Sequence, residues 1–279
     1  MTWSEPTVLG LMRKHHGRDP EAVIEAYIAD KLSAGRQRSL PIDVDGLASF
    51  LGIKQRIERF PFAGRIYAES SGQLVMDLNL EDREPRRRFT CAHEIIHTAF
   101  PGFKRQERYR SDLSTGRYTQ RDEEEYLCDK GAASLLMPTA LVRDCHDLDD
   151  GLDAIEALAG DGDVSLEAAG NRLVSLANRP AMMLVLELAH KPADRVALRR
   201  GEPIEQRLRV RYGIASGMRV FAPKHKSVAD DSLFMRALET SQRQRGRTYL
   251  PGAERHGLFD IECASYPYGD RSRVIALIR

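Results

Sequence analysis

Apolar residues recur at two different spacings along this chain, and the change of spacing separates predicted helices from predicted strands. After Pro20, apolar residues follow at intervals of three and four, which predicts a helix over residues 20–35. Residues 43–52 predict a second, shorter helix. Over residues 53–80 the pattern becomes extended, and two runs around the turn at 70–72 predict a β-hairpin that could provide an edge strand.

Two later stretches combine many apolar residues with clear stop signals. Residues 88–100 place apolar side chains at helical spacing and end at Pro101-Gly102, a strong helix break. Residues 122–138 begin with four acidic side chains, become apolar at helical spacing and end at a proline. An acidic start suits the positive end of a helix dipole. We therefore expect two helices here, the first of them buried.

The remainder of the chain changes from a helical to a mixed pattern. Residues 139–179 predict short helices, and residues 230–242 predict another. Between and after them lie β-type runs at residues 182–188, 208–212, 218–221, 261–263 and 274–278. Helical segments followed by strands with few helices predict an α+β protein with more than one domain.

The first buried helix contains His93-Glu94-x-x-His97, a motif that can hold a metal ion. Residues four apart lie on one helix face, so both imidazoles can point at one cation. The carboxylate of Glu94 lies where it can act as the general base for a zinc-dependent hydrolysis. The alternative is an ordinary amphipathic helix with two histidines on its polar face. The apolar neighbours favour burial, and buried polar groups require partners, which a metal would supply.

A catalytic zinc site uses three protein ligands and leaves one position for water. The predicted helix over residues 122–138 offers an acid for the third. Glu125 shares a helix side with Asp129 and Ala132, whereas the three acids before it are interpreted as a solvated helix start. Asp129 is a candidate for fixing the orientation of an imidazole.

These residues resemble the ImmA/IrrE family of metallopeptidases. The resemblance lies in the residue runs 88–97, 125–129 and 135–138, the last of which reads Leu-Leu-Met-Pro, and it covers about residues 40–178. By this resemblance the third zinc ligand is Glu125. The chain departs from the family where Cys128-Asp129 replaces an Ala-Asn pair and where Ile96 replaces a glycine common before the second histidine.

The resemblance also implies a domain order and an activity. It implies a zincin-like metallopeptidase core, helix-turn-helix-like helices and, as in the radiation-response members, a C-terminal α/β GAF-like sensor domain. The predicted domains are an N-terminal helical extension (1–39), the metallopeptidase core (40–138), the helix-turn-helix-like segment (139–179) and the sensor domain (180–279). The implied activity is zinc-dependent cleavage of a helix-turn-helix transcriptional repressor, which would induce a stress-response or phage-defence operon.

Two alternatives for the function lie in other classes. The protein could be a non-catalytic DNA-binding sensor with a structural zinc, or it could sequester a repressor without cutting it. The presence of Glu94 argues against a structural zinc, because a structural site has no use for a general base at that position.

Composition sets further limits. The chain has 279 residues, of which 30% are charged and 42% hydrophobic, as in ordinary globular proteins. No apolar run is long enough to span a bilayer, and no secretory signal is visible, so we expect a cytoplasmic protein without a membrane partner. The four cysteines are widely spaced and are interpreted as reduced thiols.

Charge is distributed unevenly along the chain. From residue 191 onward there are 15 Arg and 3 Lys against 10 acidic residues, a net charge of +8, whereas the whole chain has +1. A basic C-terminal part suggests an anionic partner, and single-stranded DNA is a candidate activator. The candidate contacts are Arg207, Arg209, Arg211, Arg243, Arg245 and Arg247. A salt-bridged interface within the protein is an equally good explanation.

Residues 98–121 connect the two predicted metal-binding helices and are polar. Their position makes them a candidate wall of the active site. Tyr109 and Tyr118 in this connection could each stabilise an oxyanion by donating a hydrogen bond, although a surface position is the more common place for a single tyrosine.

Overall fold

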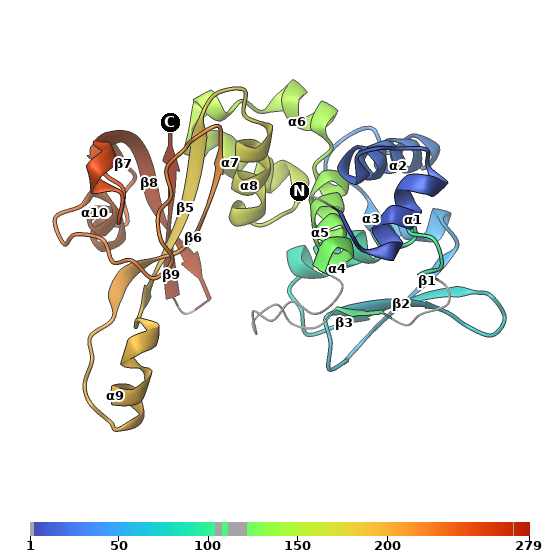
Figure 1. The fold of residues 1–279 in the computed structure, drawn as a ribbon, viewed down its shortest axis with the longest axis horizontal. Coiled ribbons are helices and arrows are strands. Elements are labelled where there is room, and N and C mark those ends of the chain that lie inside the picture. Colours follow the sequence, from blue (N-terminus) through green and yellow to red (C-terminus); the bar gives the residue numbers. More distant parts are fainter. Residues whose placement is uncertain (1–2, 104–107, 111–121, 270) are drawn as a thin grey trace. The chain divides into compact units, whose positions relative to one another are not determined.

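The computed structural model describes residues 3–103, 108–110, 122–269 and 271–279, and Figure 1 shows its helices and strands. The chain forms two compact units. One comprises Met1–Cys145 and Leu158–Ser165, and the other comprises His146–Ala157 and Leu166–Arg279. Both contain helices and a sheet, which confirms the α+β class predicted from the sequence.

Three helices open the first unit: α1 (Pro6–Lys14), α2 (Pro20–Ala34) and α3 (Val44–Phe50). Asp19 caps α2 by accepting a hydrogen bond from the backbone N–H of Glu21, and Asp43 caps α3 by accepting one from Gly46. The two helices that the sequence predicted in this region are thereby confirmed.

Four strands follow: β1 (Ile53–Glu58), β2 (Gly64–Ala68), β3 (Leu74–Asn79) and β4 (Arg108–Arg110). They form a mixed sheet in the order β1-β3-β2-β4, in which β2 and β3 are the predicted hairpin. The expectation that this hairpin provides an edge strand was wrong, because β1 pairs with β3 and β4 pairs with β2. Among the described residues, β1 and β4 are the edges of this sheet.

The metal-motif helix α4 (Glu84–His97) packs on β2 and β3 and on α5 (Asp122–Leu136), and α6 (Thr139–Cys145) follows. Gly131 allows α5 to approach α4 closely, since a Cβ atom at this position would lie 3.0 Å from two side-chain carbons of Ile96. The same atom would lie 2.9 Å from Ile24 of α2. A glycine at this point of α5 therefore brings the acidic first turn of α5 beside the histidines of α4.

The second unit is built around a five-stranded antiparallel sheet in the order β6-β5-β9-β8-β7. Its strands are β5 (Ala181–Ala189), β6 (Arg207–Ser216), β7 (Gln244–Tyr249), β8 (Leu258–Tyr268) and β9 (Arg271–Ile278). Helix α7 (Leu152–Gly162) belongs to this unit up to Ala157 and to the first unit from Leu158 onward. The α-helices that follow in this unit are α8 (Leu166–Leu176), α9 (Arg195–Arg199) and α10 (Leu233–Thr240). Short 3₁₀ turns are η3 (Leu148–Asp150), η4 (Pro192–Asp194) and η5 (Glu254–His256).

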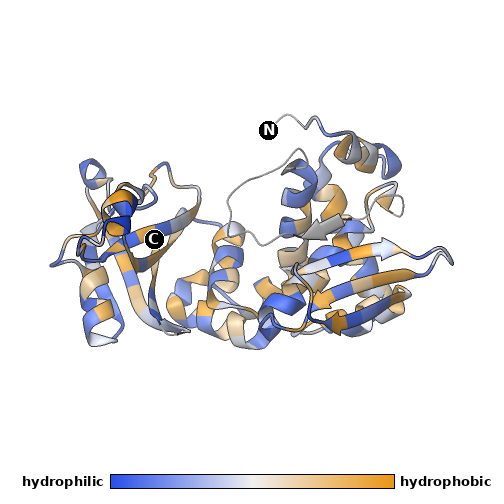
Figure 2. Cartoon of the chain, turned by 90° about the horizontal axis from the view of Figure 1, so that it is seen from below, coloured by the Kyte–Doolittle hydropathy of each residue, from blue (hydrophilic) through white to orange (hydrophobic). Residues whose placement is uncertain are grey.

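Helices cover both faces of this sheet. Alternate residues of β5, among them Met182 and Leu184, face a core that includes Leu233 and Phe234 of α10. On the opposite face α8 packs against β5 and β6, where Gly170 lies against Met183. Figure 2 shows the corresponding mixture of hydrophobic and hydrophilic residues on these elements.

Two details of the predicted C-terminal part were wrong. The chain is irregular over the predicted strand at 218–221, although Met218 and Val220 still pack against the core. Strand β7 was not predicted, because its arginines and glycine hide the alternation of a strand. The predicted helix over residues 230–242 is confirmed as α10.

The buried side of α8, which includes Ala169, Leu173 and Val174, packs on the sheet of the second unit. This gives a structural role to one helix of the pair interpreted as helix-turn-helix-like. The GAF-like identity and the four domain boundaries stay predictions. Among the described residues, no helix combines the length and apolarity needed to cross a membrane. Three cysteines, Cys91, Cys128 and Cys263, are buried and form no disulfide.

Candidate metal centre

Helix α4 presents the motif residues from a buried position. Pro85 lies in its first turn, and an ion pair of 2.9 Å between Arg86 and Asp82 supports its start. Toward its end, every residue from Thr90 to His97 is buried. The burial predicted for this helix is therefore confirmed, and the polar groups of the motif must find partners inside the protein.

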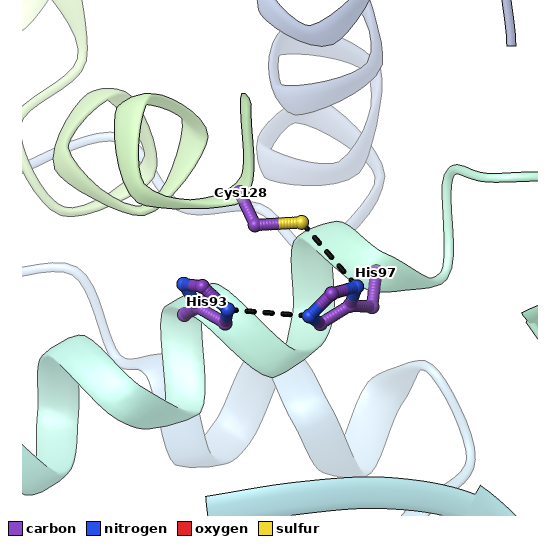
Figure 3. Close-up of side chains that lie close together, drawn as sticks. All are labelled: His93, His97 and Cys128. Atoms are coloured by element: carbon purple, nitrogen blue, oxygen red, sulfur yellow. Dashed lines mark hydrogen bonds between the residues drawn. The ribbon is translucent and has the colours of Figure 1, made fainter. Parts of the chain in front are cut away.

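The two histidines face each other. Nε2 of His93 and Nε2 of His97 lie 3.2 Å apart, and the ring centroids are separated by 4.9 Å (Figure 3). Both side chains are almost completely buried, with exposed fractions of 1% and 2%. Spacing of four residues on one helix thus brings both imidazoles to one point, as the motif predicts.

The acid assigned to the third ligand position lies at the same point. Glu125 on α5 places one carboxylate oxygen 3.2 Å from His93 Nε2 and the other 3.6 Å from His97 Nε2. Three side chains from two helices therefore converge with nitrogen and oxygen donors. This donor set is one that zinc accepts, and the Glu125 side chain is partly exposed.

Each imidazole is also held on its other nitrogen. Asp129 lies 2.9 Å from Nδ1 of His93, and Glu124 lies 3.0 Å from Nδ1 of His97. An ionised carboxylate only accepts hydrogen bonds, so each of these contacts suits an Nδ1–H donor and leaves Nε2 of the same ring directed toward the cluster. Two lone pairs and a carboxylate directed at one buried point fit a cation, which is the physical argument for a metal there.

Cys128 also lies beside the histidines, and His93, His97 and Cys128 together form a second possible donor set. Its Sγ is 3.4 Å from Nδ1 of His97, on the side of the ring away from the Nε2 pair (Figure 3). Burial raises the pKa of this thiol well above its usual value, and the carboxylate of Glu125 contributes to the same shift. The Nε2 pair with Glu125 and the set that includes Cys128 are therefore two alternative donor sets for a metal.

Glu94, the predicted general base, is buried with 1% exposure and lies next to strand β2. At Gly64 of β2, an added Cβ atom would lie 3.3 Å from Oε1 of Glu94 and would overlap the methyl group of Thr90. The absence of a side chain at Gly64 is therefore what allows the sheet to approach the side of α4 that carries Glu94.

The interpretation of the first acids of α5 as a solvated helix start was wrong for Glu124. This side chain is 1% exposed and pairs with His97, so it supports a histidine. The signal was in the sequence. Glu124 heads a stripe at helical spacing that continues through Leu127, Cys128 and Leu135, all of which are buried.

Of the two candidate oxyanion stabilisers, Tyr109 and Tyr118, the first lies among the described residues. The backbone of Tyr109 lies in β4, where it pairs with Arg65 of β2. Tyr118 lies outside the described residues. Both assignments stay predictions.

The six candidate nucleic-acid contacts lie on the two edge strands of the second unit's sheet and just before one of them. Arg207, Arg209 and Arg211 belong to β6, whereas Arg245 and Arg247 belong to β7 and Arg243 immediately precedes it. Most of these side chains form ion pairs or hydrogen bonds with other residues of the same unit.

Arg243 forms ion pairs with Asp153 at 2.5 Å and Glu156 at 2.6 Å, and Arg245 lies 2.9 Å from Glu262. Arg211 pairs with Glu187 at 3.1 Å. Arg209 donates to the backbone oxygens of Ala189 and His225, and Arg247 lies 3.7 Å from Asp260. Arg207 is exposed and forms no ion pair with any described residue. Much of the basic charge is therefore balanced by neighbouring carboxylates, in line with the salt-bridged alternative.

A mixed sheet beside a buried His-Glu-x-x-His helix, with an acid from the next helix, is the arrangement of a zincin-like metallopeptidase domain. The sequence comparison agrees. Residues 52–174 match the model of the peptidase M78 family, described as the IrrE N-terminal-like domain. This part of the chain is similar to the IrrE N-terminal-like domain, and the predicted resemblance to the ImmA/IrrE family is confirmed.

Among solved structures, the chain is similar to a Mycobacterium tuberculosis transcriptional regulator. The TM-score is 0.51 at 12% sequence identity, over 91% of this chain and 86% of the other. At this identity the similarity concerns the fold, which extends over both units. A comparison with curated proteins gave no match.

Proposed function

We propose that this protein is a zinc-dependent endopeptidase that cleaves a helix-turn-helix transcriptional repressor and so induces a stress or defence operon. The observation that supports this most directly is the convergence of His93 Nε2, His97 Nε2 and the Glu125 carboxylate, with Glu94 in the same buried helix. The peptidase M78 match supports the reaction class. The fold shared with a transcriptional regulator supports a regulatory role.

In this proposal His93, His97 and Glu125 would hold Zn²⁺. Zinc, when bound, lowers the pKa of water and polarises the carbonyl group of a peptide. Glu94 accepts the proton of the attacking water at its carboxylate and returns it to the nitrogen of the leaving amine. Asp129 and Glu124 keep the two imidazoles in one orientation and one tautomer through their bonds to Nδ1.

The test separates the general base from the ligands. Glu94→Gln should retain zinc and lose cleavage of the repressor encoded in the same operon, because an amide cannot accept the proton. Glu125→Ala should lose zinc. The measurements are metal content by mass spectrometry and cleavage by gel electrophoresis. Cleavage by a zinc-loaded Glu94→Gln protein would remove the assigned base, and full zinc content in Glu125→Ala would show that another residue is the ligand.

The same gel examines the alternatives. A complex of wild-type protein and intact repressor, without a cleaved product, would favour a repressor-sequestering protein. Binding of DNA by the protein, with no effect on the repressor, would favour a non-catalytic sensor with a structural zinc.

Activation by single-stranded DNA is the finer part of the proposal. Cleavage should rise in its presence, and the effect should weaken steeply with salt if phosphate contacts carry it. Arg207 is exposed and has no ion pair with a described residue, whereas Arg243 is held by carboxylates. Arg207→Ala should therefore weaken DNA binding more than Arg243→Ala does. An unchanged cleavage rate with DNA at low salt would point to a protein signal or a small ligand instead.

A further inference from the structure

The first described residues of the chain contact the first turn of α5. Ser4 and Glu5 immediately precede α1, and both donate hydrogen bonds to Glu123. The backbone N–H of Ser4 lies 2.9 Å from both carboxylate oxygens of Glu123, and its hydroxyl lies 2.8 Å from one of them. The backbone N–H of Glu5 donates to the same carboxylate at 2.8 Å. Glu123 therefore holds the residues that lead into α1.

The contact is reciprocal. The carboxylate of Glu5 accepts hydrogen bonds from the backbone N–H groups of Glu123, at 3.3 Å, and Glu124, at 3.2 Å. The first N–H groups of a helix have no partner inside the helix, so they need an acceptor from elsewhere. Glu5 makes no such bond to its own helix α1. Its side chain instead caps α5, a helix more than one hundred residues further along the chain.

The capped turn carries two acids of the metal centre. Glu124 binds Nδ1 of His97, and the next residue, Glu125, faces Nε2 of both histidines. Successive acids at one helix start repel one another, and the helix dipole and N–H donors offset only part of this repulsion. The backbone N–H groups of Glu123 and Glu124 are held by Glu5, and this fixes the first turn of α5. The fixed turn in turn sets where the carboxylates of Glu124 and Glu125 lie.

We propose that Glu5 is a positioning residue for the metal centre: by capping the first turn of α5, it holds Glu124 and Glu125 against the two histidines. This inference rests on the zinc site of the proposed function. It assigns a role in metal binding to a residue that lies before the matched domain, which begins at residue 52.

The single tryptophan of the chain offers a direct reporter of this contact. Trp3 lies one residue before Ser4, and its ring centroid is 6.1 Å from that of Tyr126 on α5. Tyr126 is itself held, since its hydroxyl donates to Glu21 of α2 at 3.1 Å. Loss of the contact between Ser4, Glu5 and α5 should move Trp3 away from Tyr126 and shift its fluorescence toward that of a solvated indole.

The experiment measures zinc affinity in the full chain by competition with a chromophoric chelator. Loss of a residue that orients metal ligands typically weakens metal binding 10–100-fold, and we expect about 10-fold for Glu5→Ala, because the ligands themselves remain. Glu5→Gln retains one acceptor oxygen and should give an intermediate affinity. Glu69→Ala, at an exposed turn, is the matched control with the same charge change and should bind zinc like the wild type.

Two further readouts distinguish positioning from general stability. Amide hydrogen exchange at residues 123 and 124 should accelerate in Glu5→Ala. In a Glu124→Ala background, Glu5→Ala should weaken zinc binding by clearly less than it does alone, because coupled residues do not act additively.

The outcomes separate this inference from the proposed function. If wild-type protein binds no zinc, the proposed function is wrong. If wild-type protein binds zinc and Glu5→Ala binds it equally well, only the positioning role is wrong, whether or not the amide exchange changes. Should Glu5→Ala not fold, Glu5→Gln decides by the same criterion, since it must bind zinc more weakly than Glu69→Ala.

Discussion

The packing of the sheet against the metal-motif helix predicts opposite effects of one substitution at two glycines. Gly64 lies in β2, where a Cβ atom would overlap the methyl group of Thr90 and approach Oε1 of Glu94 to 3.3 Å. Gly160 lies exposed in α7, where a Cβ atom would meet nothing within 4 Å. Both belong to the first unit. Gly64→Ala should destabilise that unit, and Gly160→Ala should stabilise it.

The magnitudes decide the sign at each site. An added buried methyl group contributes about 0.8 kcal/mol of hydrophobic stabilisation, and loss of a glycine restricts the unfolded chain by about 0.4–1 kcal/mol. Overpacking of a core against a stiff, β-branched neighbour such as Thr90 outweighs both gains, and the destabilisation that remains after they are counted is about 1–3 kcal/mol. Gly64→Ala should therefore lower the free energy of unfolding by about 1–3 kcal/mol. Gly160→Ala should raise it by about 0.5–1 kcal/mol, as for alanine in a helix.

The assay is urea denaturation followed by the fluorescence of Trp3, which lies in the same unit. A compensating variant sharpens it. Thr90→Ser removes the methyl group that the new Cβ atom would overlap, so Gly64→Ala should cost less in that background. The coupling energy should fall in the range of about 0.5–3 kcal/mol expected for residues in contact. If the proposed function is correct, Gly64→Ala alone should also slow cleavage, because the new Cβ atom approaches Oε1 of Glu94.

Equal stability of Gly64→Ala and Gly160→Ala would refute this reasoning. So would strict additivity of Gly64→Ala and Thr90→Ser, since it would mean that β2 and α4 do not lie in contact at this point. Glu94 would then be placed wrongly as well.

Three further predictions follow from other parts of the structure. Glu124→Ala should weaken zinc binding 10–100-fold, because it leaves Nδ1 of His97 unsupported; affinity measured by chelator competition tests this. Burial raises the pKa of Cys263 from 9.0 to about 12, so the folded state retains this proton longer than the unfolded state. Stability should therefore decrease between pH 9 and pH 12, and Cys263→Ala should reduce the slope by up to about 1.4 kcal/mol per pH unit in urea titrations. Arg243→Ala should destabilise the second unit by about 1–3 kcal/mol, measured by denaturation followed by circular dichroism, because Glu262 and Glu156 lose a partner; unchanged stability would contradict the structural role of this arginine.

Local pattern was sufficient to predict the elements that carry the candidate site. The helical spacing and the proline signals gave α4 and α5, and the i, i+4 rule placed His93 and His97 on one face. The assignment of Glu125 needed the family resemblance. Four consecutive acids all carry a carboxylate, and they differ only in the direction in which each side chain leaves the helix. Glu124 was misread for that reason, since its partner His97 lies 27 residues away.

Pairing between distant segments explains the remaining errors. The hairpin of β2 and β3 followed from its turn, but the parallel pairing of β1 and the addition of β4 depend on contacts that no local pattern records. In the second unit, β7 holds Arg245 and Arg247 on the face where Glu262 and Asp260 lie. Arg245 and Arg247, which looked like part of an anion-binding surface in the sequence, therefore lie beside acids of a neighbouring strand.

The acidic start of α5 has a different explanation from that of an ordinary solvated helix end. Three consecutive carboxylates repel one another, and a helix dipole offsets only about 0.3–1 kcal/mol for each at an exposed surface. Here all three have partners: Glu123 accepts hydrogen bonds from Ser4 and Glu5, Glu124 binds Nδ1 of His97, and Glu125 faces Nε2 of both histidines. A cation between the histidines would relieve the remaining repulsion at Glu125. The stability of this turn should therefore depend on zinc, and chelation should loosen α5 first at the residues that Glu5 caps.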